Sequence, residues 1–173
     1  MFNILIINLL ITLIPSKRHM DKFDHSLPMM LHRTLDSIIP KYRVVFSEHN
    51  ISEQQWRILR VLWEQNRSTS SELAKKTLLP APSMVGVIDR MIAKGLLKRQ
   101  RDAKDRRVVY VSLTDQGEAL LQTLIPKVDQ IYHQIINSCD QKSWSTMINT
   151  LQTIIDTANR SSDQKPTNNE VYI

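Results

Sequence analysis

The sequence predicts a mainly α-helical fold with a small β-wing. Residues 69–95 contain two short helical patterns that meet at a proline-rich turn. Residues 96–113 follow with two strand-like runs on either side of a charged turn. The whole chain of 173 residues includes only three glycines and few other strand-like runs, which is typical of a mostly helical protein.

The first short helix is predicted from its start signal. Thr69 and Glu72 have the spacing of a capping box, in which each side chain accepts a hydrogen bond from the other residue's backbone amide. The helix should end before Pro80, because a proline disfavours helical backbone at the preceding residue. Its apolar side is expected to turn inward through Leu73, Ala74 and Leu78.

The second short helix is predicted from a proline, an apolar stripe and a glycine. Pro82 suits a first helical turn, where a missing N–H costs little. Met84, Ile88 and Met91 follow at helical spacing and should be buried, and Gly95 is a natural left-handed residue after the last turn. Two short helices joined by a tight turn form a helix-turn-helix.

A β-hairpin is predicted directly after these helices. Leu96–Arg101 and Val108–Leu113 should be its strands, the second of them rich in β-branched residues. The polar residues 102–107 should form the turn between them. A helix-turn-helix followed by a charged hairpin is a winged helix, which indicates DNA as a partner.

The distribution of charge supports this interpretation. From Ser52 to Leu113 the chain has thirteen Lys and Arg residues against six Asp and Glu, a net charge of +7, whereas the whole chain has +6. A basic run is often no more than a solvated face. Here the net positive charge is concentrated in one segment, which favours a phosphate backbone as its partner.

Composition and motifs argue against an enzyme and against a metal site. The sequence lacks the G-x-G-x-x-G, Walker and H-E-x-x-H patterns, and its five histidines do not have the spacing of metal ligands. No cofactor is therefore expected. The single Cys139 excludes an internal disulfide and a thiolate cluster, in keeping with a cytoplasmic protein. A redox role for Cys139 is disfavoured by the neighbouring Asp140, which opposes a thiolate.

Residues 1–19 form an apolar extension. The segment is too short to span a bilayer, and its basic residues Lys17 and Arg18 follow the apolar run instead of preceding it. The preferred interpretation is a start codon assigned too far upstream, with Met20 as the true start. A membrane anchor is the alternative, and the protein is otherwise expected to have no membrane partner.

The remaining segments flank residues 51–113, the predicted DNA-binding domain. Ser52 should cap a helix with Trp56 and Trp63 as core anchors. Residues 20–50, with Pro40 as a kink, and residues 114–158, with Pro126 as a bend, carry helical apolar stripes. A winged helix covers its own core, so these stripes predict N- and C-terminal dimerisation helices in a two-fold homodimer. Residues 159–173 are expected to be a disordered tail.

Several motifs resemble those of one family. They are Ile51–Trp56 at the start of the second helix, Asp89-Arg90-Met91 in the helix-turn-helix, Gly95-Leu96-Leu97 after it, the turn 102–107 and Ser112–Gly117. Together they resemble the MarR family of bacterial transcription regulators over residues 26–157. Residues 26–31, 53–57 and Pro82-Ser83 look like the subgroup that represses homoprotocatechuate operons.

The resemblance implies a dimeric repressor that binds a palindromic operator in double-stranded DNA. Many family members have Thr and Arg where this chain has Val85 and Gly86, so base readout is expected to use Ser83, Val85 and backbone groups near Gly86. Arg107 matches the minor-groove arginine of the family, and Asp105 is placed to hold it. The expected DNA-binding residues are Ser71, Lys75, Pro82, Ser83, Val85, Gly86, Arg90, Lys98, Arg101, Asp105, Arg106 and Arg107.

The resemblance also implies a small phenolic or aromatic carboxylate as effector. Arg33 matches an arginine of relatives that bind such acids, and a guanidinium can grip a carboxylate through two parallel hydrogen bonds. Trp56 would supply an aromatic wall, with His32 or Arg43 as a second polar contact. The alternatives are an Arg33 that pairs with an acid across the dimer, and a regulator of stress, antibiotic-resistance or virulence genes with a different or no ligand.

Overall fold

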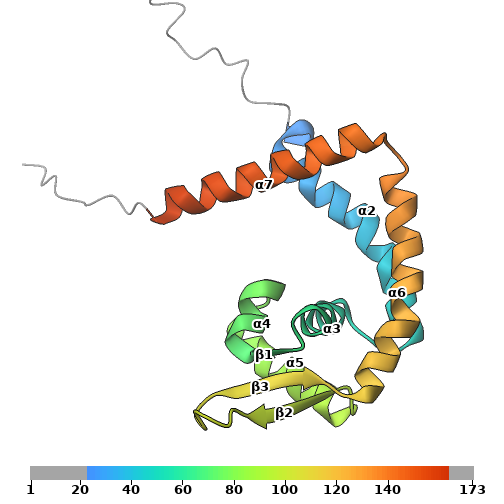
Figure 1. Ribbon diagram of the computed structural model, residues 1–173. Coiled ribbons are helices and arrows are strands. Elements are labelled where there is room, and N and C mark those ends of the chain that lie inside the picture. Colours follow the sequence, from blue (N-terminus) through green and yellow to red (C-terminus); the bar gives the residue numbers. More distant parts are fainter. Residues whose placement is uncertain (1–22, 164–173) are drawn as a thin grey trace, which may run out of the picture. The chain divides into compact units, whose positions relative to one another are not determined.

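The computed structural model describes residues 23–163, and side chains over 23–160 (Figure 1). The predictions for residues 1–19 and for the end of the tail lie outside this range. The chain divides into two compact units, one ending at Leu121 and one beginning at Gln122. The described elements are η2 (Phe23–His25), α2 (Leu27–Glu48), α3 (Glu53–Gln65), β1 (Arg67–Thr69), α4 (Ser70–Thr77), α5 (Ala81–Ala93), β2 (Leu97–Arg101), β3 (Val109–Leu113), α6 (Asp115–Ile136) and α7 (Gln141–Asp163). The predicted fold class, mainly helical with a small β-wing, is confirmed.

Helix α3 begins at the predicted cap. The Ser52 hydroxyl accepts a hydrogen bond from the Gln55 amide at 3.2 Å, and the Gln55 side chain accepts one from the Ser52 amide at 3.0 Å. The polar Gln55 is buried, because this exchange satisfies its side-chain amide. Trp63 was expected to anchor the core, but 41% of it is exposed. The core on this helix is formed by Ile58, Leu59 and Leu62.

The capping box of α4 is present as predicted. The Glu72 carboxylate accepts a hydrogen bond from the Thr69 amide at 2.7 Å, and the Thr69 hydroxyl accepts one from the Glu72 amide at 3.3 Å. The bond from the Thr69 backbone lowers the pKa of Glu72. Leu73 and Ala74 are buried as expected.

The prediction for Leu78 was wrong, since it is 84% exposed. Helix α4 ends at Thr77, which takes the inward position, and its hydroxyl donates to the Leu73 carbonyl at 2.6 Å. Leu78 then adopts a left-handed conformation with a φ of 57°, which points its side chain into solvent. That conformation is costly for a leucine, since its Cβ lies close to the following carbonyl oxygen.

Replacing Leu78 with asparagine should therefore stabilise the protein. Asparagine tolerates the left-handed region, so we expect a gain of about 0.5–1 kcal/mol in the free energy of unfolding. Thermal unfolding followed by circular dichroism measures this. The matched control is Lys76→Asn, which places the same residue inside α4 and should destabilise it by roughly 0.5 kcal/mol. A lower melting temperature for Leu78→Asn than for the wild type would contradict the strain at this position.

Helix α5 follows a short turn and has the predicted inward face. Pro82 lies in its first turn, and Met84, Ile88 and Met91 are buried. After Lys94 the backbone of Gly95 has a φ of 72°, the left-handed value expected there. Helix α5 contacts α3, α4 and β2, and these elements surround the core of the first unit (Figure 1).

The wing is a three-stranded antiparallel sheet in the order β1-β3-β2. Strands β2 and β3 each begin one residue later than predicted, and pair from Leu97 with Leu113 to Arg101 with Val109. Strand β1 was not predicted, because three residues carry too little pattern to be recognised. It pairs with β3 through Arg67 opposite Ser112 and Thr69 opposite Tyr110.

The start of α6 is joined closely to the wing. The Thr114 hydroxyl donates to the Gly95 carbonyl at 2.5 Å and accepts a hydrogen bond from the Gly117 amide at 3.1 Å. A Cβ at Gly117 would lie 2.2 Å from the Leu96 carbonyl oxygen, so only glycine allows this close approach. The wing and the first turn of α6 therefore form one packed piece.

The second unit contains the rest of α6 and all of α7. The Asp140 carboxylate caps α7 by accepting a hydrogen bond from the Ser143 amide at 2.9 Å. The helix continues to Asp163, beyond the predicted end at residue 158, because no proline or glycine interrupts the chain there. Within residues 23–163, no helix is both long and apolar enough to cross a membrane.

Candidate DNA-binding surface and effector region

Helix α5 presents a face of mixed polar, charged and small apolar residues to solvent. Its buried stripe of Met84, Ile88 and Met91 forces the other side of the helix outward. Val85 is 51% exposed, and Gly86 is partly exposed on the same outer side. The structure places the predicted residues Ser71, Lys75, Pro82, Ser83, Val85, Arg90, Lys98, Arg101, Arg106 and Arg107 on the exposed surface of the first unit.

The turn of the wing is ordered by one carboxylate. Asp102 Oδ1 accepts hydrogen bonds from the amides of Lys104 at 2.8 Å and Asp105 at 3.1 Å. The amide of Asp102 in turn donates to the carbonyl of Val108 at 2.9 Å and closes the turn. The hydrogen bonds from the Asp105 and Lys104 amides lower the pKa of Asp102.

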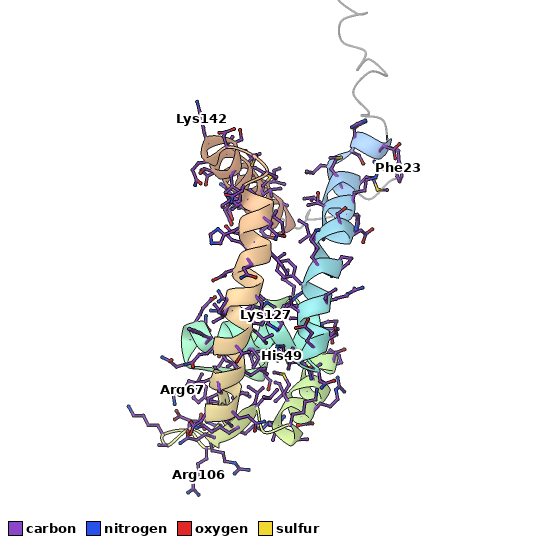
Figure 2. All side chains as sticks on the ribbon, turned by 90° about the vertical axis from the view of Figure 1, so that its right-hand side faces the viewer. Phe23, His49, Arg67, Arg106, Lys127 and Lys142 are labelled. Atoms are coloured by element: carbon purple, nitrogen blue, oxygen red, sulfur yellow. The ribbon has the colours of Figure 1, made fainter. Side chains whose placement is uncertain are left out.

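Asp105 holds Arg107 at the tip of the wing. Its carboxylate accepts hydrogen bonds from Arg107 Nε at 3.2 Å, from the Arg107 amide at 3.0 Å and from Nη2 at 3.4 Å. The Arg107 side chain nevertheless remains 90% exposed. Arg106 projects from the same tip (Figure 2). The wing therefore carries two outward guanidinium groups, one of them oriented by a carboxylate.

The two carboxylates of the wing turn, Asp102 and Asp105, keep their negative charge at every pH near neutrality. The hydrogen bonds from the Arg107 side chain, and then from its amide, lower the pKa of Asp105, as the turn amides lower that of Asp102. Because the pKa of each group is lowered in the folded state, its charged form contributes fully to the stability of the fold at every pH above the ordinary pKa of about 3.9. The contribution is lost only when the pH falls through the lowered pKa of each group.

Arg67 braces the base of the wing. Its guanidinium carbon lies 4.1 Å from the centre of the Tyr110 ring, and its Nη2 lies 4.0 Å from Asp102 Oδ2. Sequence reasoning missed this residue because it missed β1. The only sequence feature that could have indicated it is its position as a basic residue just before the Thr69 cap.

A second ion pair joins α5 to the wing. Arg99 Nη1 of β2 lies 2.7 Å from Asp89 Oδ1 of α5. This contact joins the two elements expected to meet DNA. The guanidinium of Arg99 is thereby engaged by Asp89.

An aromatic stack lies between α2 and α3. The ring centre of Phe46 is 6.2 Å from that of Tyr42 and 5.3 Å from that of Trp56. The guanidinium carbon of Arg60 lies 6.0 Å from the Trp56 ring centre, and Arg60 Nη2 lies 2.9 Å from Glu64 Oε1. Arg43, a predicted effector residue, lies one turn before Phe46 on α2 and is exposed.

Arg33 and His32 lie towards the other end of α2. Arg33 is thirteen residues before Phe46 in the same helix, a separation of about 20 Å at the rise of an α-helix. Its Nη1 is 4.0 Å from Asp24 Oδ1, and His32 is exposed. One protomer therefore does not bring Arg33 and His32 together with Trp56. Sequence reasoning missed Arg60, which its spacing of four residues from Trp56 would have indicated.

The comparison with known proteins agrees with this geometry. The MarR family profile matches residues 51–109. The homoprotocatechuate degradative operon repressor of Escherichia coli is 30% identical over 145 residues, which cover 84% of this chain and 98% of that protein. The transcriptional regulator FarR of Neisseria gonorrhoeae is 32% identical over 110 residues, covering 64% of this chain and 75% of that protein.

A solved structure extends the likeness to the fold. The crystal structure of NadR in complex with 4-hydroxyphenylacetate superposes with a TM-score of 0.68 at 26% identity, and the match covers 78% of this chain and 95% of that chain. The chain therefore belongs to the MarR family: it is a DNA-binding transcription regulator built on a winged helix-turn-helix, and it is not an enzyme.

Proposed function

We propose that the protein is a cytoplasmic, dimeric repressor of an aromatic-acid catabolic operon, released from its operator by a phenolic carboxylate. The observation that carries the effector part of this proposal is the stack of Phe46, Trp56 and Arg60, an aromatic wall with a guanidinium over it. The DNA-binding part rests on family membership together with the exposed face of α5 and the exposed basic residues of the wing.

Helix α5 would lie in the major groove of the operator, with the wing in the adjacent minor groove. The exposed residues Pro82, Ser83 and Val85 belong to the first turns of α5, the part of a recognition helix that meets base edges. Ser71 and Lys75 on α4 would contact the phosphate backbone, as would Lys98 and Arg101 on β2.

A two-fold dimer is supported by apolar residues that a single chain leaves exposed. On α2 these are Leu27, Met30, Leu31 and Leu35, and on α7 they are Met147, Ile148, Ile154 and Ile155. Exposed apolar residues that recur along both terminal helices are typical of an interface with a second copy. In such a dimer the two recognition helices would meet successive major grooves about 34 Å apart.

The DNA-binding part of the proposal predicts a palindromic operator and a strong dependence on salt. Selection from a pool of random duplexes should recover an imperfect palindrome with half-sites one helical turn apart. With about eight phosphate contacts in the dimer, the slope of log affinity against log salt should be about −7. Lys75→Ala removes one contact from each protomer, so it should make this slope shallower by about 2 without changing the selected sequence. Selection of a non-palindromic site, or binding that is independent of salt, would contradict the proposal.

Two relatives support a phenolic acid as effector. One acts on a homoprotocatechuate degradative operon by its name, and the other was solved with 4-hydroxyphenylacetate. Both compounds are hydroxylated phenylacetates, with a ring to stack and a carboxylate to pair. The Trp56 indole can stack on such a ring, and the Arg60 guanidinium can pair with its carboxylate in exchange for Glu64.

Arg33, His32 and Arg43 complete the proposed effector region. Arg43 lies near the stack on the same protomer, whereas Arg33 and His32 would have to come from α2 of the second copy. The arginine that pairs with the carboxylate is therefore either Arg60 of the same protomer or Arg33 of the second copy. In the first case, changing Arg60 should abolish the response to the acid. In the second case, changing Arg33 should abolish it. Measuring release of the operator by 4-hydroxyphenylacetate for each variant distinguishes them, and a panel of phenolic acids that releases no complex would reject the effector proposal.

A further inference from the structure

Gly86 stands apart from the other two glycines of the chain. Gly95 needs its left-handed φ, and Gly117 needs the space taken by the Leu96 carbonyl. Gly86 lies inside α5 without a positive φ, and a Cβ built there would meet only Arg90 Nη1, at an ordinary distance of 3.5 Å. A glycine within a helix costs about 1 kcal/mol relative to alanine. The packing of the protomer gives no reason for that cost.

The neighbour of Gly86 suggests a reason. Long side chains on a helix point back towards its N-terminus and cover the preceding turn. The Arg90 guanidinium follows this rule, since Nη1 lies within contact of the position that a side chain at Gly86 would begin to occupy. The missing side chain thus leaves room for a guanidinium over the middle of α5, on the side that also exposes Ser83.

The guanidinium of Arg90 is also left available. The adjacent carboxylate, Asp89, is held by Arg99 at 2.7 Å. Arg90 is exposed and has no ion pair with any residue in the described range 23–160. The helix therefore carries a planar, permanently charged donor group on its outer face, directed towards the turns that precede it.

We infer that Arg90 reads a guanine in each half-site of the operator. An arginine can donate two hydrogen bonds to O6 and N7 of guanine in the major groove. The first turns of a recognition helix lie nearest the base edges, and Gly86 lets the guanidinium of Arg90 lie over the middle of α5, towards those turns. Arg90 is thereby a determinant of sequence specificity and not one more phosphate contact. This inference rests on the proposed DNA-binding mode.

The test compares affinity for the selected operator with affinity for duplexes carrying each other base at every symmetric position. The wild type should prefer guanine at one position per half-site, by about tenfold to hundredfold for each half-site that is changed. Arg90→Ala should lose affinity for that operator by a similar factor, and should bind all four bases at that position within about twofold. Lys75→Ala is the matched control and should weaken binding to every duplex equally.

Three results would overturn the inference. If Arg90→Ala weakens binding to every duplex by the same factor, Arg90 contacts phosphate. If the wild type selects a palindrome without a guanine whose recognition depends on Arg90, the inference fails while the proposed function stands. If the wild-type protein binds DNA without any sequence preference, both this inference and the proposed function are contradicted.

Substitutions at Gly86 test the role of the glycine while Arg90 is kept. Gly86→Ala adds a Cβ that meets Nη1 at 3.5 Å, so it should retain the preference for guanine and raise the melting temperature. Gly86→Leu fills the space over the turn and should lose the preference, as Arg90→Ala does. The double variant Gly86→Leu/Arg90→Ala should then lose no more of it than either single variant. Full preference in Gly86→Leu, at normal thermal stability, would contradict the proposed role of Gly86.

Discussion

Arg107→Ala should weaken operator binding by at least about tenfold, and by more than Lys104→Ala does. An arginine inserted into a narrow minor groove meets concentrated negative potential, whereas a lysine on the turn meets only the screened phosphate backbone. The two hydrogen bonds from the Arg107 guanidinium to Asp105, through Nε and Nη2, orient the guanidinium in the free protein, so less conformational freedom is lost on DNA binding. Fluorescence anisotropy with a labelled operator measures the difference.

Asp105→Asn is a useful companion to this experiment. The asparagine oxygen can still accept from the Arg107 amide, but the charge that holds the guanidinium is gone. Its loss of affinity should fall between those of Lys104→Ala and Arg107→Ala. Equal losses for Lys104→Ala and Arg107→Ala would show that Arg107 contacts phosphate without a special place in the minor groove.

Arg60→Gln should leave operator affinity unchanged and abolish release by a phenolic acid. Arg60 lies over Trp56 on α3 and belongs to neither α5 nor the wing, so its removal leaves the proposed DNA contacts in place. A glutamine cannot supply the charged pair of donors that a carboxylate requires. Titrating the preformed operator complex with 4-hydroxyphenylacetate tests this prediction.

Arg33→Gln is the matched variant, because it removes the same group from the far part of α2. If the carboxylate pairs with Arg60, the Arg33→Gln variant should still release its operator when the acid is added. A full response in Arg60→Gln and none in Arg33→Gln would transfer the role to an arginine of the second copy. A full response in both variants would contradict an arginine anchor altogether. With either arginine, the acid can release the operator only if it binds the DNA-free conformation of the protein more tightly than the DNA-bound one.

Local signals in the sequence were sufficient for much of the fold. The caps at Ser52 and Thr69, the stripe from Met84 to Met91 and the left-handed Gly95 each depend on residues within one or two helical turns. Such patterns are visible in a single sequence because their physical cause is equally local.

The features that sequence reasoning missed depend on contacts between distant segments. Strand β1 exists because β3, more than forty residues later, offers it a partner. The exposure of Leu78 was missed because the polarity of a residue was taken as a guide to its side of the helix, and the buried Gln55 departs from the same rule. A capping hydrogen bond reversed that rule for Gln55, and a helix end reversed it for Leu78.

The candidate site divides in the same way. The basic residues of α5 and the wing were found because charge concentrates along one segment of sequence. The contacts that orient them, Asp89 with Arg99 and Arg67 with Tyr110, join separate elements and carry no sequence signal. In the effector region, Arg33 and Trp56 were grouped by family likeness, but the length of α2 separates them within one protomer.

The most direct test of the account is a single titration of the operator complex. Fluorescence anisotropy would follow the full chain on its selected operator while 4-hydroxyphenylacetate is added, with 4-hydroxyphenylacetamide as the control that keeps the ring and lacks the charged carboxylate. We expect the acid to release the DNA at micromolar to millimolar concentration and the amide to leave the complex intact. A complex that survives millimolar acid, or that the amide releases equally well, would contradict a repressor governed by a phenolic carboxylate.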